Sequence, residues 1–112
     1  MTAASQQDVA SRFGALFVPA EPLDKAGVAL HTLASMPLNA LRHQPVQGTS
    51  GWYIWGGERL SEDPHFFVSL HHEHLAQHCP SLIPYLGLGP GWRVLLASNQ
   101  DEVWFDPKLL AV

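Results

Sequence analysis

The clearest pattern of hydrophobic and polar positions lies mid-chain, where the four large residues from Trp52 to Trp55 are flanked by glycines. Aromatic and β-branched residues bounded by glycines are typical of a strand. Alternation along such a strand would place Trp52 and Ile54 on one face and Tyr53 and Trp55 on the other. Because both faces are bulky, the pattern predicts a central strand that is covered on two sides.

Two helices are predicted before this strand. An apolar stripe at helical spacing follows the capping residues 5–8 and ends before Pro19; it consists of Val9, Phe13, Leu16 and Phe17. A second helix is expected over residues 23–36, although Gly27 weakens it because glycine lowers helix propensity. We interpret residues 37–45, which show no clean period, as a loop packed on the core.

Further elements are predicted after the strand. Asp63-Pro64 is typical of a helix start, and we expect a third helix over residues 63–79. Pro80 can open a short helical turn that Gly87 closes in a left-handed conformation. Residues 92–97 and 102–105 predict an antiparallel hairpin, followed by a last short turn after Asp106-Pro107.

The order helix, helix, strand, helix, strand, strand predicts an α+β fold. We expect a small antiparallel sheet of about three strands packed with three to four helices. A chain of 112 residues is long enough to form one domain with its own core. The expected single domain covers residues 1–112, with an N-terminal helix and connector over 1–22 and the core over 23–112.

The composition argues against two classes of partner, nucleic acids and membranes. The net charge is -4 and only six residues are Lys or Arg, which argues against nucleic acid because phosphate binding needs a basic patch. No apolar run approaches the roughly 20 residues of a membrane span, and the N-terminus lacks the features of an export signal. Cys79 is the only cysteine, so no internal disulfide can form. We therefore expect a cytoplasmic protein that binds neither nucleic acid nor membranes.

Histidines gather on the third predicted helix: His71, His72, His74 and His78. On a helix, His71, His74 and His78 would share one face, and such spacings can place two imidazoles on one zinc ion. In the other interpretation His71 and His74 are partly buried and hydrogen-bonded to neighbouring loops, while the remaining histidines are solvated. Since the sequence marks neither a third ligand nor a carboxylate partner, metal binding stays unknown.

No catalytic set is evident. His78 would point about 100° away from Cys79 on a helix, so we predict that Cys79 is a buried structural thiol. Residues 48–51 precede a strand and lack a lysine or helix start, which favours a turn over a phosphate loop. We predict no catalytic and no cofactor-binding residues, and a protein that is not an enzyme.

Residues 48–58, with the sequence GTSGWYIWGGE, resemble the hallmark segment of bacterial immunity proteins of the immunity family 33-like group. The similarity continues in residues 37–39, 41–43, 66–67, 70–71, 73–75, 79–80, 85–88, 90–93 and 102–106. It covers roughly Lys25 to Leu110 and includes His71 and His74, whereas His72 and His78 fall at variable positions. The resemblance implies a single immunity-protein-like domain that binds a cognate toxin or effector in the cytoplasm and neutralises it.

Three functions are thus considered. The first is a non-enzymatic, antitoxin-like binder; its four tryptophans are candidate binding anchors, although core residues are as good an interpretation. The second is a metal-binding or metal-dependent module that uses His71 and His74 with His78. The third is an accessory or oligomerising domain. The sequence leaves the toxin, the binding surface and the oligomeric state open.

Overall fold

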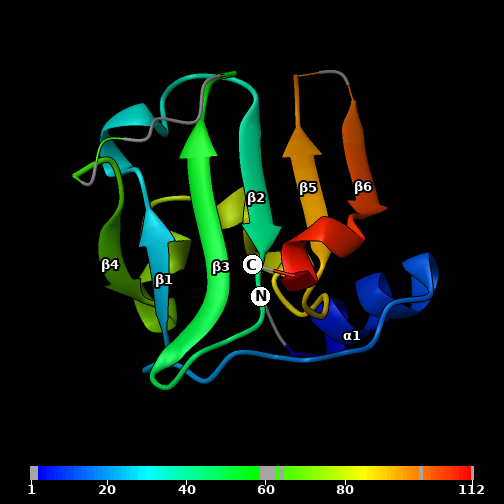
Figure 1. Cartoon of the computed structure of the whole chain (residues 1–112). Helices are drawn as coiled ribbons and strands as arrows, with labels where there is room; N and C mark the ends of the chain where they lie inside the picture. The colour runs from blue at the N-terminus through cyan, green and yellow to red at the C-terminus, as the bar shows by residue number, and fades with distance from the viewer. Residues whose placement is uncertain (1–2, 59–62, 64, 99, 112) are drawn as a thin grey trace.

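The computed structural model describes residues 3–58, 63, 65–98 and 100–111, which form one α-helix, six strands and four 3₁₀ helices (Figure 1). In chain order the elements are α1 (Ala3–Phe13), β1 (Lys25–Val28), η1 (Leu30–Thr32), β2 (Leu38–Arg42), β3 (Thr49–Gly56), β4 (Val68–His71), η2 (His72–Gln77), η3 (Pro80–Tyr85), β5 (Trp92–Leu96), β6 (Asp101–Phe105) and η4 (Pro107–Ala111). Among these residues, no helix is both long and apolar enough to cross a membrane.

All six strands belong to one mixed sheet in the order β4-β1-β3-β2-β5-β6 (Figure 1). β1 and β3 run parallel, with Gly27 opposite Tyr53 and Val28 opposite Ile54. The other adjacent pairs are antiparallel. β3 therefore lies between the two strands that precede it in the chain and pairs with one of them along each edge.

The predicted fold class is wrong. A sheet of about three antiparallel strands with three to four packed helices was expected, whereas the described residues form six strands in a mixed sheet with a single α-helix. The three strands that the prediction lacks are β1, β2 and β4. They lie in the regions interpreted as the second helix, the loop over 37–45 and the third helix.

β1 replaces part of the second predicted helix, over residues 23–36. Its burial alternates, since Ala26 and Val28 are buried while Lys25 is exposed and Gly27 half-buried. Small apolar residues at these positions fit a helical period and a period of two equally well. Pairing with β3 on one side and β4 on the other decides in favour of the strand, because a segment containing glycine has little helix propensity to oppose it.

β2 replaces the predicted loop over residues 37–45. It pairs with β3 on one side and β5 on the other, and Leu38, Ala40, Leu41 and Arg42 are all buried. Because residues on both faces are covered, hydrophobic and polar positions do not alternate. The segment consequently has no period that a reading of the sequence could detect.

The third predicted helix, over residues 63–79, is also wrong. Val68–His71 form β4, an edge strand antiparallel to β1, and the chain then turns into η2. Asp63 opens a turn instead of a helix: its carboxylate accepts from the His65 N–H (2.9 Å) and its carbonyl from the Phe66 N–H (3.0 Å). Pro64 lies outside the described residues. The free edge of β1 offers backbone partners to residues 68–71, and this tertiary pairing overrides the helical spacing.

Several other predictions are confirmed. β3 contains residues 52–55, with Trp52 and Ile54 fully buried on one face. β5 and β6 form the predicted antiparallel hairpin, and η3 begins at Pro80. The first helix exists but ends at Phe13 instead of continuing to Phe17, because Gly14 takes a positive φ of 69°. Gly87 has no positive φ, so its predicted left-handed cap is wrong. The division into residues 1–22 and 23–112 stays a prediction.

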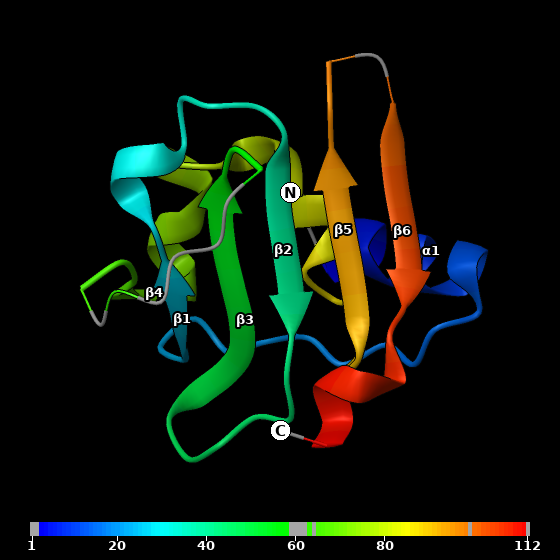
Figure 2. The same cartoon turned by 45° about the horizontal axis from the view of Figure 1, so that its top comes forward.

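The main core lies between the sheet and a layer formed by α1, η2 and η3; Figure 2 shows α1 behind β5 and β6. These three elements contribute Val9, Leu75 and Leu82, respectively, to the buried cluster that contains Trp52 and Ile54. The indole N–H of Trp52 donates to the Leu86 carbonyl over 3.1 Å, which satisfies the polar atom of this buried ring. The layer of α1, η2 and η3 thus covers this side of the sheet.

Arg42 connects three chain segments to the end of β2 through hydrogen bonds. It is 2% exposed, and its guanidinium donates to the carbonyls of Ser50 (2.8 Å), Val18 (2.6 Å) and Leu88 (2.7 Å). Burial lowers the pKa of Arg42 to about 10, against an opposing effect of Asp24, so the side chain stays protonated at neutral pH. A buried cation that is satisfied by backbone carbonyls has a structural role.

Candidate functional site

The opposite side of the sheet is only partly covered. On β3, Tyr53 and Trp55 point away from the helical layer, and Leu41 of β2 pairs with Tyr53. We call this side the front face; it comprises this side of the sheet, residues 66–67 before β4, and η4, and it faces the viewer in Figures 1 and 2. Phe66 and Leu109 pack there in a second, smaller buried cluster with Leu41 and Trp55.

Edge-to-face aromatic contacts organise the centre of the front face. Tyr53 lies between His43 (ring centroids 5.5 Å apart) and Phe67 (5.2 Å), and Phe67 also contacts Trp55 (6.3 Å). Phe66 extends the chain of rings beyond Phe67, at 4.9 Å. Such pairs add roughly 0.5–1.5 kcal/mol each to the burial of their surface, so these rings hold one another in place. Tyr53 nonetheless remains 38% exposed.

A hollow of about 360 Å³ opens beside these rings. Tyr53, Trp55 and Phe67 line it together with Leu41, His43 and Val46, among others. The volume is at the lower end of the range for small-molecule pockets, and it also suits one large side chain of a protein partner.

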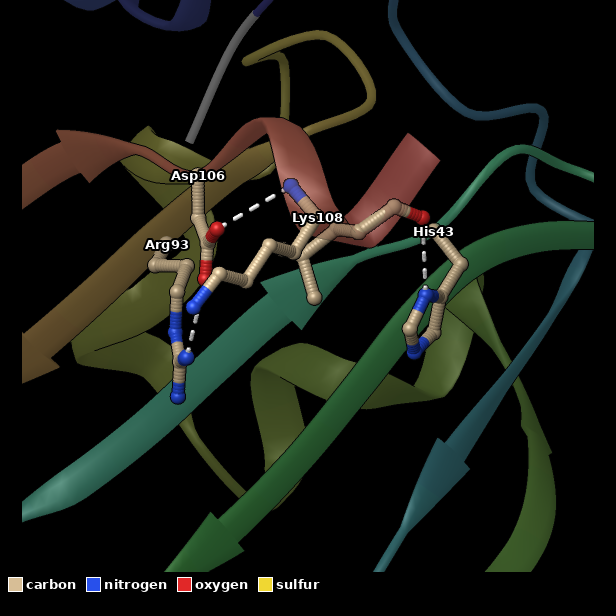
Figure 3. A network of polar contacts seen from close by, with 5 residues as sticks. His43, Arg93, Asp106 and Lys108 are labelled. Atoms are coloured by element: carbon tan, nitrogen blue, oxygen red, sulfur yellow. Dashed lines mark hydrogen bonds and ion pairs between the residues drawn. The ribbon is translucent and has the colours of Figure 1, made fainter. Parts of the chain in front are cut away.

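Gly51 sets the position of His43 in this arrangement. It has a positive φ of 89°, and a Cβ there would collide with the His43 carbonyl. The close approach allows the His43 N–H to donate to the Gly51 carbonyl over 2.9 Å, just beyond the last residue of β2. His43 is thereby held beside Tyr53, and its Nδ1 lies 3.1 Å from the carbonyl oxygen of Leu109 in η4 (Figure 3).

The β5–β6 side of the front face combines an exposed tryptophan with a half-buried arginine. Trp104 is 39% exposed, and the Arg93 guanidinium lies 5.4 Å from the centroid of its ring. Arg93 is paired with Asp106 (3.4 Å), whose carboxylate also accepts from the Lys108 N–H over 3.1 Å at the start of η4 (Figure 3). These contacts hold Arg93 against the sheet and leave the Trp104 ring partly free.

Two donors of the front face lack acceptors. In the part of the chain that the structure describes, the buried side-chain atoms without a hydrogen-bond partner are the indole nitrogen of Trp55 and Nε of Arg93. Buried donors without acceptors are uncommon in folded proteins and cost free energy. That both belong to this face, and not to the main core, sets it apart from the closed side of the sheet.

The chemistry of the hollow favours binding. Its described lining includes one imidazole, from His43, and no carboxylate or thiol. The lining also contains the hydroxyls of Thr49 and Tyr53, but the His43 ring contacts the Leu109 carbonyl and the Thr49 hydroxyl donates to the Val46 carbonyl, so His43 and Thr49 are not paired as base and nucleophile. The front face instead presents tyrosine, tryptophan and arginine, the residue types that contribute most to protein–protein binding energy.

The predicted histidine group is partly assembled. His71 ends β4 and His74 lies in η2, and their rings stack with centroids 6.2 Å apart. Glu73, which was not predicted as a ligand, joins them: the ligand atoms of His71, Glu73 and His74 all lie within 4.8 Å of one another. His78 follows η2, is exposed, and does not belong to this group.

His72 and Cys79 have structural surroundings. His72 was expected to be solvated, but it is half-buried and its Nε2 lies 2.6 Å from Ser50 Oγ. Burial lowers the pKa of His72 to about 4, helped by the positive charge of Arg42 and opposed by Asp24. Cys79 is buried, as predicted, and burial raises the pKa of its thiol to about 11.

Some residues of the front face were missed in the sequence. The alternation in residues 52–55 correctly separates Tyr53 and Trp55 from Trp52 and Ile54. Phe67 was placed on a helix and His43 in a loop, so neither was connected with Tyr53. The alternation in residues 92–96 would have put Arg93 on the side opposite Val94, which is a signal that could have found it.

Comparison with known proteins identifies a family. The family model for the Imm33-like domain matches residues 5–106, nearly the whole chain. Neither the curated proteins nor the solved structures gave a match. The match confirms the resemblance and extends it toward the N-terminus, from Lys25 to residue 5. The chain therefore belongs to the Imm33-like domain family.

Proposed function

We propose that this protein is an immunity protein that binds a cognate toxin or effector in the cytoplasm and neutralises it by occupying its surface. The observation that carries the proposal is the match to the Imm33-like domain over residues 5–106, since that domain belongs to an immunity protein family. In this proposal the protein is not an enzyme. Its partner is a protein, and neither nucleic acid nor a membrane takes part.

We further propose that the front face is the binding surface. Tyr53 and Trp104 are large, partly exposed rings that lie on rigid strands, so little conformational entropy is lost when a partner covers them. β3 and β6 are separated by β2 and β5, which places the two rings roughly 14 Å apart at about 4.8 Å per strand. That span is well within one side of a standard protein interface.

The hollow of the front face supports the same surface. The hollow beside Tyr53 can receive an apolar side chain from the partner, because aromatic and aliphatic residues dominate its lining.

Co-expression with the toxin encoded beside the gene tests the proposal. Wild-type protein should rescue growth and form a complex of equal stoichiometry with the purified toxin, measured by calorimetry. Absence of both rescue and complex would reject the function as a whole.

Front-face variants test the surface separately. Trp104→Ala and Tyr53→Ala should each raise Kd at least about fivefold, because truncating an interface anchor costs more than about 1 kcal/mol. Leu16→Ala is the control, since Leu16 is 78% exposed and lies outside the front face. If all three variants bind as tightly as the wild type, the toxin uses another surface even though the function holds.

A further inference from the structure

We propose that His71, Glu73 and His74 form a binding site for one divalent transition-metal ion of the zinc type. The proposal does not rest on the immunity function, and the site lies at the outer edge of the sheet, on β4 and η2 (Figure 1).

The backbone holds the three residues in one place. His71 pairs with Lys25 at the end of the β1–β4 ladder, and its extended conformation (φ −67°, ψ 143°) turns the chain directly into η2. The next two N–H groups are both bonded to the connector before β1. His72 N–H donates to the Asp24 carbonyl (2.9 Å) and Glu73 N–H to the Pro22 carbonyl (3.0 Å).

Local geometry brings the side chains together. Residues three apart in a 3₁₀ helix lie nearly above one another, and His71 and His74 have this spacing across the start of η2. Their rings are stacked at an interplanar angle of 29°, and Glu73 Oε1 lies 3.5 Å from His74 Nε2.

The distances are close to those of a bound metal. Ligand atoms about 2.1 Å from a tetrahedral zinc ion are roughly 3.4 Å from one another. The three ligand atoms here lie within 4.8 Å, so a contraction of about 1.4 Å at most is needed. The side chains of Glu73 and His74 are 43% and 46% exposed, which leaves them free to rotate by that amount.

The donor set selects the class of metal. Two imidazoles and one carboxylate suit zinc and neighbouring transition metals, whereas magnesium and calcium prefer oxygen ligands alone. Three protein ligands leave a fourth position for water or for a side chain of another molecule. A bound ion would join the last residue of the edge strand β4 to η2.

Metal titration of protein made without a histidine tag tests the site. After treatment with a chelator, zinc chloride should bind with one equivalent per chain in calorimetry and raise Tm by about 5 °C at saturating zinc. Cobalt in place of zinc should give the visible absorption of a four-coordinate ion.

Substitutions at exposed residues should leave the fold intact, so that a change in zinc binding reports on the metal site itself. His74→Ala should weaken zinc binding at least about tenfold and remove the Tm shift, and Glu73→Gln should weaken it less. His78→Ala is the matched control, because His78 is an exposed histidine four positions away that does not belong to the group. The proposal is overturned if zinc does not saturate at one equivalent, if His74→Ala binds like the wild type, or if His78→Ala loses the site.

Discussion

Gly27 of β1 provides the space in which the Tyr53 ring of β3 lies. The two residues are opposite each other in the parallel pair, and a Cβ at Gly27 would come within 2.7 Å of Tyr53 Cδ1. Tyr53 cannot simply turn aside, because His43 and Phe67 contact its ring from either side. The position of the most central exposed ring of the front face thus depends on a missing side chain in the neighbouring strand.

Gly27→Ala should therefore displace Tyr53. We expect a loss of about 1–3 kcal/mol in the free energy of unfolding, as for other overpacked sites, and a Kd for the toxin that rises at least about tenfold. Urea denaturation and calorimetry measure the two effects. Gly89→Ala is the control, since its Cβ would meet nothing closer than 3.4 Å, and it should change stability by less than about 0.5 kcal/mol. Equal behaviour of the two variants would contradict the proposed role of Gly27.

Arg42→Met should be strongly destabilising. The substitution removes the hydrogen bonds to Val18, Ser50 and Leu88 and leaves three carbonyls without their cationic donor. We expect a loss of about 3–5 kcal/mol in urea denaturation, because bonds to charged groups contribute about 1.5–3 kcal/mol each and are not additive. Arg12→Met, at an exposed arginine of α1 that lies over Phe13, should cost less than about 1 kcal/mol. A loss at Arg42 no larger than that at Arg12 would show that water replaces the three bonds.

Ile54→Ala should cost about 2–5 kcal/mol, the range for emptying a filled core position. Ile54 is 0% exposed in the middle of β3 and belongs to the main core cluster. Leu23→Ala is the matched surface change, since Leu23 is 67% exposed and should lose less than about 0.5 kcal/mol. Thermal or urea unfolding of both variants measures the two losses of stability. A near-neutral Ile54→Ala would refute the central position of β3.

Cys79 should resist thiol reagents in the folded protein. Burial raises the pKa of the Cys79 thiol from 9.0 to about 11, and its Sγ–H donates to the Leu75 carbonyl at 3.5 Å. Since only the thiolate reacts, its smaller fraction at pH 8 alone should slow labelling about 100-fold relative to the unfolded chain. Labelling with a disulfide reagent in buffer and in urea provides the comparison. Similar rates in both would mean that Cys79 is accessible in the native state.

The sequence correctly predicts those strands whose residue types favour a strand without reference to the rest of the fold. Residues 52–55 and the β5–β6 hairpin are rich in aromatic and β-branched side chains, which favour strands regardless of their neighbours. β1 and β4 are strands because each offers the other an edge, and β2 because β3 and β5 flank it. Such pairings join distant segments, so neither Gly27 nor Leu41 indicates them locally.

The candidate site, too, is only partly predictable from the sequence. Tyr53 and Trp55 could be assigned to one face from alternation, whereas their contact with His43 and Phe67 depends on the tertiary fold. His71 and His74 were grouped on a helix, and they do meet, because a 3₁₀ turn also brings residues three apart together. Glu73 joins them through its own side chain, whose Oε1 lies 3.5 Å from His74 Nε2.

The strand order β1-β3-β2 has a consequence for synthesis on the ribosome. The first two strands to emerge, β1 and β2, are not neighbours, and the place between them belongs to a strand that is made later. Until residues 49–56 leave the exit tunnel, neither early strand has a sheet partner from the chain that precedes it. β3 supplies the missing partner of both, and β4 and β5 pair with the outer edges of β1 and β2, respectively. A nascent chain that stops before β3 therefore lacks the strand that joins β1 to β2, so the native strand order cannot form until β3 has been made.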